Sequence, residues 1–278
     1  MDRIPFGISR LDATIGGGAP AGSVVLLTGD VGAGAREFCY TSAALNALAR
    51  ADRTQFELYY GDLEPAATRP GAVHYVTFTD QSDAVLDEMR FAMEDDLVDA
   101  AAAEIGVEDL SKHYFQLTPV PTEWYSETTP DIRKLGENQQ RRELLEVLGE
   151  FFTEHAAGNL VIVDSVTDLL DAAGGRIGPT KLIYMLKGLS RAAYQWGGLV
   201  LLLASTASID PTTLGRLKDA VDGTLAFEWE SGGSERARTL VVEEFRGVLS
   251  RIESEDIVRF ETEIRESGFD ISNVRKIR

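Results

Sequence analysis

Short apolar runs along the chain alternate with longer segments in which apolar residues recur at helical spacing. Within the runs, polar residues rarely take alternate positions, which is typical of strands buried on both faces of a parallel sheet. This pattern predicts strands over residues 24–28, 74–78, 114–118, 160–164 and 199–204.

Helical periodicity fills several of the intervals between these strands. An apolar stripe begins at Phe38 and ends at Leu48, and further stripes run through residues 137–155 and 179–196, just before the fourth and fifth predicted strands. Strands that alternate with helices in this way favour an α/β fold with a doubly wound, mostly parallel sheet.

The C-terminal part of the chain has a different pattern. Residues 223–230 and 238–247 read as two strands around the glycine-containing stretch SGGSERA at 231–237, which predicts a β-hairpin. The alternating stretch 256–271 would extend that antiparallel edge with a closing strand. Two further segments are expected outside regular structure, residues 59–72 and 118–131.

Composition narrows the class of protein. The net charge of −18 comes from 45 acidic and 27 basic residues spread along the chain, and such a surface repels bare nucleic acid. The even spread favours a protein adapted to high internal salt, with an ordinary acidic protein as the alternative. One cysteine, Cys39, excludes an internal disulfide, and the longest apolar run, at 199–204, is too short to span a bilayer. We expect a cytoplasmic protein without a membrane segment.

The stretch GDVGAGAR after the first predicted strand is the main candidate for chemistry. A loop between a strand and a helix N-terminus presents unpaired N–H groups to an anion, and glycines let its backbone approach phosphates closely. We therefore predict a nucleotide-binding loop made of consecutive residues: Gly29, Asp30, Val31, Gly32, Ala33, Gly34, Ala35 and Arg36.

The loop lacks the side chains that phosphate-binding loops use. Ala35 stands where a lysine would reach the β- and γ-phosphates, and Arg36 stands where a hydroxyl would bind Mg²⁺. A lost hydrogen bond to a charged group costs roughly 1.5–3 kcal/mol, which binding survives more easily than phosphoryl transfer does. Arg36 could replace the lysine, Glu37 could simply offset its charge, or a carboxylate could occupy the phosphate position.

Motifs along the whole chain resemble the KaiC-like branch of the RecA superfamily of P-loop ATPases. Residues 6–34 resemble the branch's N-terminal motif, and NLVIVDSVTDLL at 159–170 resembles its Walker B strand with Asp164 at the Mg²⁺ position. Residues 219–247 resemble its terminal hairpin, and 258–271 its closing strand. The chain is most similar to the degenerate, HTR-like proteins of halophilic archaea.

This resemblance implies a RecA-like P-loop NTPase core with a C-terminal β-hairpin extension in one domain over residues 1–278. The core would cover about 22–210, and the hairpin with the closing strand about 222–272. It also implies ATP with Mg²⁺ as the ligand, with Asp164 organising the metal, and a homo-oligomer, hexameric in many members. Alternatively, Asp164 caps backbone groups or pairs with a base.

Further differences from the family pattern lie at the positions of its catalytic residues. Its catalytic carboxylate pair appears here as Thr79 and Asp80, and the lysine of its hairpin motif is Glu244, which leaves Arg246 as the residue able to reach a neighbour's phosphate. We therefore expect a regulatory or signalling protein that binds ATP weakly or not at all, hydrolyses little of it, and acts through an unidentified protein partner.

Two alternatives remain open. The first is a weak ATPase in which Arg36, Asp80 and Arg246 compensate for the lost groups. The second is a RecA-like, DNA-associated accessory protein, although the basic residues near the relevant loops are few and lack interleaved aromatics: Arg176, Lys181, Arg216 and Lys218. The three histidines show no ligand spacing, so a separate metal site is not expected.

Overall fold

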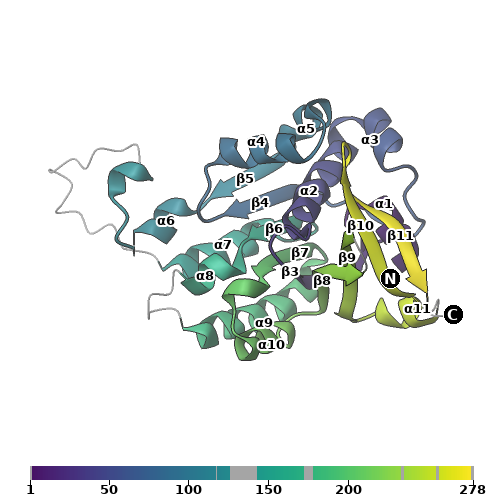
Figure 1. Ribbon diagram of the computed structural model, residues 1–278. Coiled ribbons are helices and arrows are strands. Elements are labelled where there is room, and N and C mark those ends of the chain that lie inside the picture. Colours follow the sequence, from purple (N-terminus) through teal and green to yellow (C-terminus); the bar gives the residue numbers. More distant parts are fainter. Residues whose placement is uncertain are drawn as a thin grey trace.

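The computed structural model describes residues 2–116, 118–125, 143–171, 178–232, 235–254 and 257–276 (Figure 1). The first half of the described chain contains these elements: β1 (Arg3–Ile4), α1 (Ser9–Ile15), β2 (Ala19–Pro20), β3 (Ser23–Gly29), α2 (Ala35–Ala51), α3 (Arg53–Tyr59), β4 (Val73–Thr77), α4 (Ser82–Ala92), α5 (Asp95–Ala102), β5 (Ile105–Asp109), α6 (Ser111–Phe115) and the 3₁₀ turn η1 (Thr122–Trp124). The second half contains α7 (Leu144–His155), β6 (Leu160–Asp164), α8 (Val166–Asp171), α9 (Pro179–Trp196), β7 (Leu199–Ser205), the 3₁₀ turn η3 (Thr206–Ser208), α10 (Pro211–Lys218), β8 (Gly223–Gly232), β9 (Glu235–Phe245), α11 (Leu249–Ser254), β10 (Ile257–Arg265) and β11 (Gly268–Lys276).

A nine-stranded sheet organises the molecule in the order β11-β10-β9-β8-β3-β7-β6-β4-β5. The strands from β8 to β5 in this order are parallel to one another, and β9, β10 and β11 continue the sheet with antiparallel pairings. The predicted α/β class, with a mostly parallel sheet and a C-terminal antiparallel extension, is confirmed.

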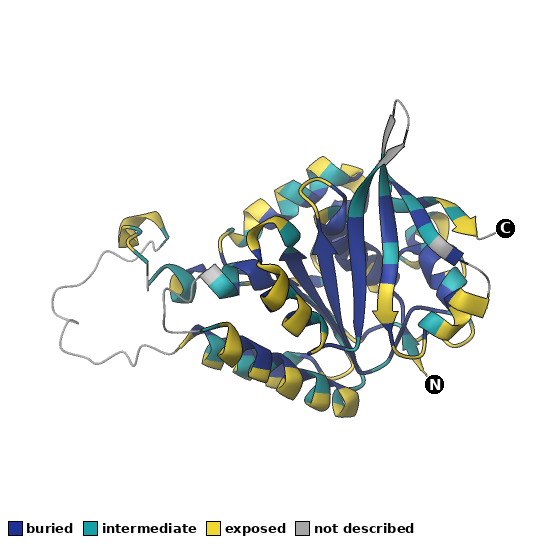
Figure 2. Cartoon of the chain, turned by 60° about the horizontal axis from the view of Figure 1, so that its bottom comes forward, coloured by how far each residue is buried: buried dark blue, intermediate teal, exposed yellow. Residues whose placement is uncertain are grey.

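Helices cover both faces of the sheet, with α2 to α5 on one side and α7 to α10 on the other (Figure 1). Successive residues of β3 alternate between the two cores: Val25 and Leu27 pack under α2, whereas Val24 and Leu26 pack towards α9 and α10. Figure 2 shows the resulting layers, in which the central strands are buried and the outer helix faces are exposed. The continuous apolar runs reflect burial on both faces.

The predicted strand at 114–118 is wrong. Its first residues belong to α6, whose start is fixed by the Asp109 carboxylate accepting a 2.8 Å hydrogen bond from the Ser111 N–H, and residue 117 lies outside the described residues. The edge strand is β5 instead. Its sequence IGVED has only Ile105 buried, because an edge strand covered on one face needs few apolar residues.

Other predicted elements differ in extent. Helix α7 begins at Leu144, and residues 137–142 lie outside the described part of the chain. Strands β8 and β9 run closer together than expected, since Gly232 pairs with Glu235, so the connection is shorter than 231–237. The closing stretch 256–271 is not one strand: β10 ends at Arg265 and β11 returns from Gly268, whose φ of +96° suits a tight turn.

Of the segment predicted to be irregular at 59–72, Tyr59 ends α3 and residues 60–72 contain no helix or strand. Of the segment predicted at 118–131, residues 118–125 contain only the short η1 turn, and residues 126–131 lie outside the described residues. Within the described ranges, no helix combines the length and the apolar character needed to cross a bilayer.

Candidate functional site

The glycine loop lies between the end of β3 and the start of α2, at the carboxyl edge of the parallel strands. Gly32 and Gly34 have φ of +74° and +108°, which residues with a Cβ rarely adopt. Gly29 has no room for a side chain, because a Cβ there would lie 2.7 Å from the Cβ of Ala35. A pocket of about 340 Å³ opens beside the loop and is also lined by Arg36, Ser165 and Ser205.

The loop and the first turn of α2 line this pocket, and several of their backbone N–H groups have no backbone acceptor. The first helical bond of α2 runs from the Phe38 N–H to the Gly34 carbonyl at 2.9 Å, so the earlier N–H groups of the helix have no intrahelical acceptor. Within the described residues, the N–H groups of Gly32 and Gly34 donate no backbone hydrogen bond. This geometry suits an anion.

The C-terminal hairpin holds the outer side of the loop. The Trp229 indole N–H donates to the Val31 carbonyl at 3.0 Å, and the Arg238 Nε–H donates to the Gly32 carbonyl at 3.0 Å. Trp229 and Arg238 are cross-strand partners in β8 and β9, and the guanidinium lies 4.8 Å from the indole ring centre. Two loop carbonyls are thus bound by the hairpin, which stabilises the glycine conformation.

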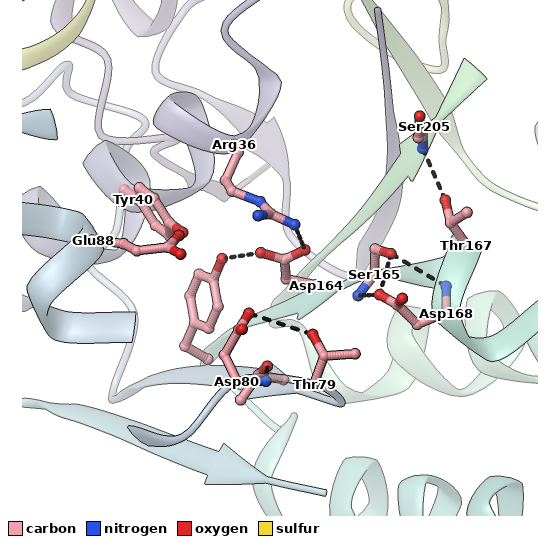
Figure 3. Close-up of polar contacts among 12 residues, drawn as sticks. Arg36, Tyr40, Thr79, Asp80, Glu88, Asp164, Ser165, Thr167, Asp168 and Ser205 are labelled. Carbon is pink, nitrogen blue, oxygen red and sulfur yellow. Dashed lines mark hydrogen bonds and ion pairs between the residues drawn. The ribbon is translucent and has the colours of Figure 1, made fainter. Parts of the chain in front are cut away.

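Arg36 crosses the inner side of the site to Asp164. One guanidinium nitrogen lies 3.0 Å from Asp164 Oδ1, and the Tyr75 hydroxyl donates to Oδ2 at 2.7 Å (Figure 3). The Asp164 side chain is 5% exposed, whereas that of Arg36 is 47% exposed. Both carboxylate oxygens therefore already have a donor from this chain.

Burial and charge act in opposite directions on these groups. Burial raises the pKa of Asp164, while the positive charge of Arg36 and the hydrogen bond from Tyr75 oppose that shift. Burial alone would lower the pKa of Arg36, but the combined attraction of Asp164 and the neighbouring Tyr40, Tyr75 and Glu88 raises it above its usual value. The guanidinium thus stays protonated beside the carboxylate.

The topology explains why an arginine makes this contact. Asp164 ends β6, which is separated from β3 by β7, so the two strands lie about 10 Å apart at the usual strand spacing. A side chain from the first turn of α2 must cross that interval to reach the carboxylate. The long arginine does so directly, whereas a serine or threonine at this position would need an intervening ion.

A divalent cation does not fit this arrangement. Each Asp164 oxygen already accepts a hydrogen bond, Arg36 offers a positive charge where a hydroxyl ligand would stand, and no group of three or more potential ligating side chains occurs among the described residues. Asp164 pairs with a base, which is the alternative weighed for it from the sequence.

Asp80 follows β4 and lies near Asp164 without lining the pocket (Figure 3). Its N–H donates to Thr77 Oγ1 at 3.1 Å, and its carboxylate accepts a long 3.4 Å hydrogen bond from Thr79. Burial and the neighbouring Glu88 carboxylate raise the pKa of Asp80, and Arg36 opposes this. Glu88 itself accepts a hydrogen bond from the Tyr40 hydroxyl. The acids behind the pocket are therefore mostly engaged with this chain's own donors.

Arg246 lies at the opposite end of the sheet from the glycine loop. Its side chain is 83% exposed and pairs with Asp222 at 3.5 Å, and Asp222 also accepts from the N–H of Val24 near the start of β3. Since Gly29 ends that strand, five residues further on, about 17 Å separate this region from the loop. Arg246 cannot serve the glycine loop of its own chain. Arg246 also lines a second pocket, which has a volume of about 520 Å³.

Sequence reasoning missed four residues of the site: Tyr75, Thr206, Trp229 and Arg238. Thr206 donates to Asp30 Oδ1 at 2.8 Å and so fixes the first residue of the loop after β3. The hairpin was predicted, but its register, which pairs Trp229 with Arg238 over the loop, was not. A tyrosine inside an apolar strand was the one available signal for Tyr75, because a buried hydroxyl needs a partner.

Comparisons with known proteins agree with the fold. No family model matches the chain, and no curated protein matches it. Among solved structures, a KaiC-like protein from the hyperthermophilic archaeon Pyrococcus horikoshii matches with a TM-score of 0.62 and 17% identity, over 98% of this chain and 99% of that one. An identity this low establishes the fold alone. The chain has the RecA-type α/β fold of a KaiC-like protein.

Proposed function

We propose that this chain is a regulatory protein of the KaiC-like branch that hydrolyses little or no ATP and acts by binding a protein partner. One observation carries the proposal: Asp164, at the position expected to organise a metal, is held instead by Arg36 and Tyr75. Phosphoryl transfer depends on positioned charge and metal, so occupying this carboxylate removes a main contribution to catalysis.

Other features support the same reading. Ala35 brings no charge to the pocket, and Asp80 is shorter than the glutamate expected of a family base. The loop itself retains the backbone geometry of an anion site. Loss of the lysine contact alone costs roughly 1.5–3 kcal/mol, or about ten- to 150-fold in affinity. We therefore propose that the protein binds ATP weakly at most. Any bound ATP would regulate the protein and would not be hydrolysed at a useful rate.

Self-association is part of the proposal. Arg246 is exposed and distant from its own loop, so it could contact a phosphate only in a neighbouring subunit. The expected arrangement is a homo-oligomer, hexameric as in many KaiC-like proteins. The molar mass in solution, measured by light scattering after size exclusion, tests this: a monomer over the whole concentration range would contradict it.

Hydrolysis is tested by phosphate release from Mg-ATP in molar KCl, with Asp164→Asn as the matched control. The asparagine keeps an acceptor for Tyr75 but cannot organise a metal, so any background common to both proteins is not site-specific. We expect equal rates.

A wild-type rate clearly above that of the control would contradict the proposal. It would favour the alternative, a weak ATPase that uses Arg36, Asp80 and Arg246. Circular dichroism on both proteins checks that the substitution leaves the fold intact.

A further inference from the structure

The contact between Arg36 and Asp164 also bears on how the pocket recognises a ligand. We propose that the Arg36 guanidinium permanently replaces a divalent cation, so that the glycine-loop pocket binds a phosphate-bearing anion without Mg²⁺. This inference rests on the proposed function only in using the same site, and it adds the class of ligand and the independence from metal.

The first step is the occupancy of the carboxylate. Asp164 accepts from Arg36 on one oxygen and from Tyr75 on the other, and it is buried. Mg²⁺ demands near-ideal octahedral geometry with oxygen ligands, and here it would have to displace a guanidinium of like charge. The guanidinium of Arg36 already supplies the positive charge that a metal ion would bring to the Asp164 carboxylate.

The second step concerns the donors that Arg36 has left. A guanidinium has five N–H groups, and among the described residues Arg36 donates to Asp164 alone, from one terminal nitrogen. Its side chain is 47% exposed and lines the pocket together with the glycine loop. Guanidinium groups bind phosphate through paired N–H donors, so Arg36 and the loop N–H groups converge on the same space.

The third step concerns the acids around the pocket, which limit affinity. Asp30 and Glu37 line it, and Asp164 offsets the charge of Arg36. Asp30 Oδ1 accepts from the Thr206 hydroxyl, so this carboxylate is tied to η3 at the end of β7. Attraction then comes from directed N–H donors rather than from net charge. We expect weak but saturable binding, in the micromolar to millimolar range.

The first experiment needs no ligand. The melting temperatures of the wild type, Arg36→Thr and Arg50→Thr are compared in MgCl₂ and in KCl of equal ionic strength. Arg50 is the matched control, because it is another α2 arginine with an acidic partner, Glu104, away from the pocket. We expect Mg²⁺ to raise the melting temperature of Arg36→Thr alone, since threonine supplies a hydroxyl and frees Asp164.

The second experiment titrates ATP and pyrophosphate into the wild type by calorimetry, once in EDTA and once in Mg²⁺. We expect saturable binding in EDTA, with affinities in the two conditions within about threefold of each other, and loss of the EDTA binding in Arg36→Thr. Binding of ATP without pyrophosphate also supports the proposal and adds the nucleoside to the recognised group.

Two results would overturn the proposal. One is wild-type binding at least about tenfold tighter in Mg²⁺ than in EDTA, and the other is no saturable binding of either anion in EDTA. Both readouts use the wild type, so they stand even if Arg36→Thr folds poorly. Neither depends on turnover, so a failure here is distinguishable from measurable ATP hydrolysis, which would contradict the proposed function instead.

Discussion

The ion pair between Arg36 and Asp164 should be measurable as a coupling free energy. Arg36→Ala leaves a buried carboxylate whose remaining side-chain donor, among the described residues, is Tyr75. Breaking a fully buried pair from one side costs about 3–5 kcal/mol. Because the Arg36 side chain is 47% exposed, solvent screens part of the interaction, and we expect roughly half of that cost, about 1.5–2.5 kcal/mol.

A double-mutant cycle isolates the pair from the other effects of each substitution. Asp164→Asn keeps the hydrogen bond with Tyr75 but removes the negative charge, after which a half-exposed Arg36 can be solvated. The double variant should therefore cost less than the sum of the single variants, with a coupling of about 1–2 kcal/mol. In a chain of this size, Arg36→Ala alone should lower the melting temperature by about 3–10 °C.

Urea unfolding of the four proteins at neutral pH measures the coupling through the change in free energy of unfolding. Additivity within about 0.5 kcal/mol would refute the reasoning, because it would mean that the two groups do not interact in solution. The pH supplies a second readout. Burial raises the pKa of Asp164, and without Arg36 less opposes that shift. Arg36→Ala should then lose stability, relative to the double variant, as the pH rises through the raised pKa.

Three further predictions concern the glycine loop, its contact with the hairpin, and the buried Asp12 of α1. Gly34→Ala should cost about 1–3 kcal/mol in urea unfolding because its φ is +108°, while Gly215→Ala, in α10 with open space around its Cβ, should be neutral or stabilising. Trp229→Phe keeps a ring but loses the hydrogen bond to the Val31 carbonyl, so hydrogen exchange of the glycine-loop amides should become faster. Unchanged exchange would contradict the view that the hairpin stabilises the loop. Burial raises the pKa of Asp12 from 3.8 to about 7, so the native state binds more protons than the unfolded state between those pH values. The free energy of unfolding of the wild type should therefore fall, relative to that of Asp12→Asn, as the pH rises from about 4 to 7. Parallel plots of stability against pH for the two proteins would contradict this.

The parallel core was predictable because burial on both faces leaves continuous apolar runs. Strands β3, β4, β6 and β7 each carry such a run, and the pattern located all of them. The edge strand β5 did not meet this criterion, because a strand covered on one face needs few apolar residues. In its sequence IGVED, the apolar residues Ile105 and Val107 are followed by glycine or acidic residues. The aromatic stretch that follows it was more apolar and was mistaken for the strand, although Tyr114 and Phe115 form the end of α6.

The site was predictable as a place but not as a set of contacts. The glycine spacing located the loop, and the end of an apolar strand located Asp164. The pairing of Arg36 with Asp164 could not be deduced, because it depends on strand order, which places β6 two positions from β3. The contacts of Trp229 and Arg238 with the loop depend likewise on the register of β8 and β9. Distances between elements far apart in sequence require the assembled sheet.

The glycines of the loop have a reason to be there that is independent of any ligand. A Cβ on Gly29 would collide with Ala35, and a Cβ on Gly34, besides its positive φ, would lie 3.0 Å from the Phe269 ring of β11. The fold alone therefore requires these glycines, and their spacing does not by itself indicate phosphate binding. The residue that can discriminate is Arg36, because the fold needs no cation there except to match Asp164. Its remaining N–H donors are what makes the loop a ligand site as well as a turn in this proposal, and pyrophosphate binding in EDTA tests them directly.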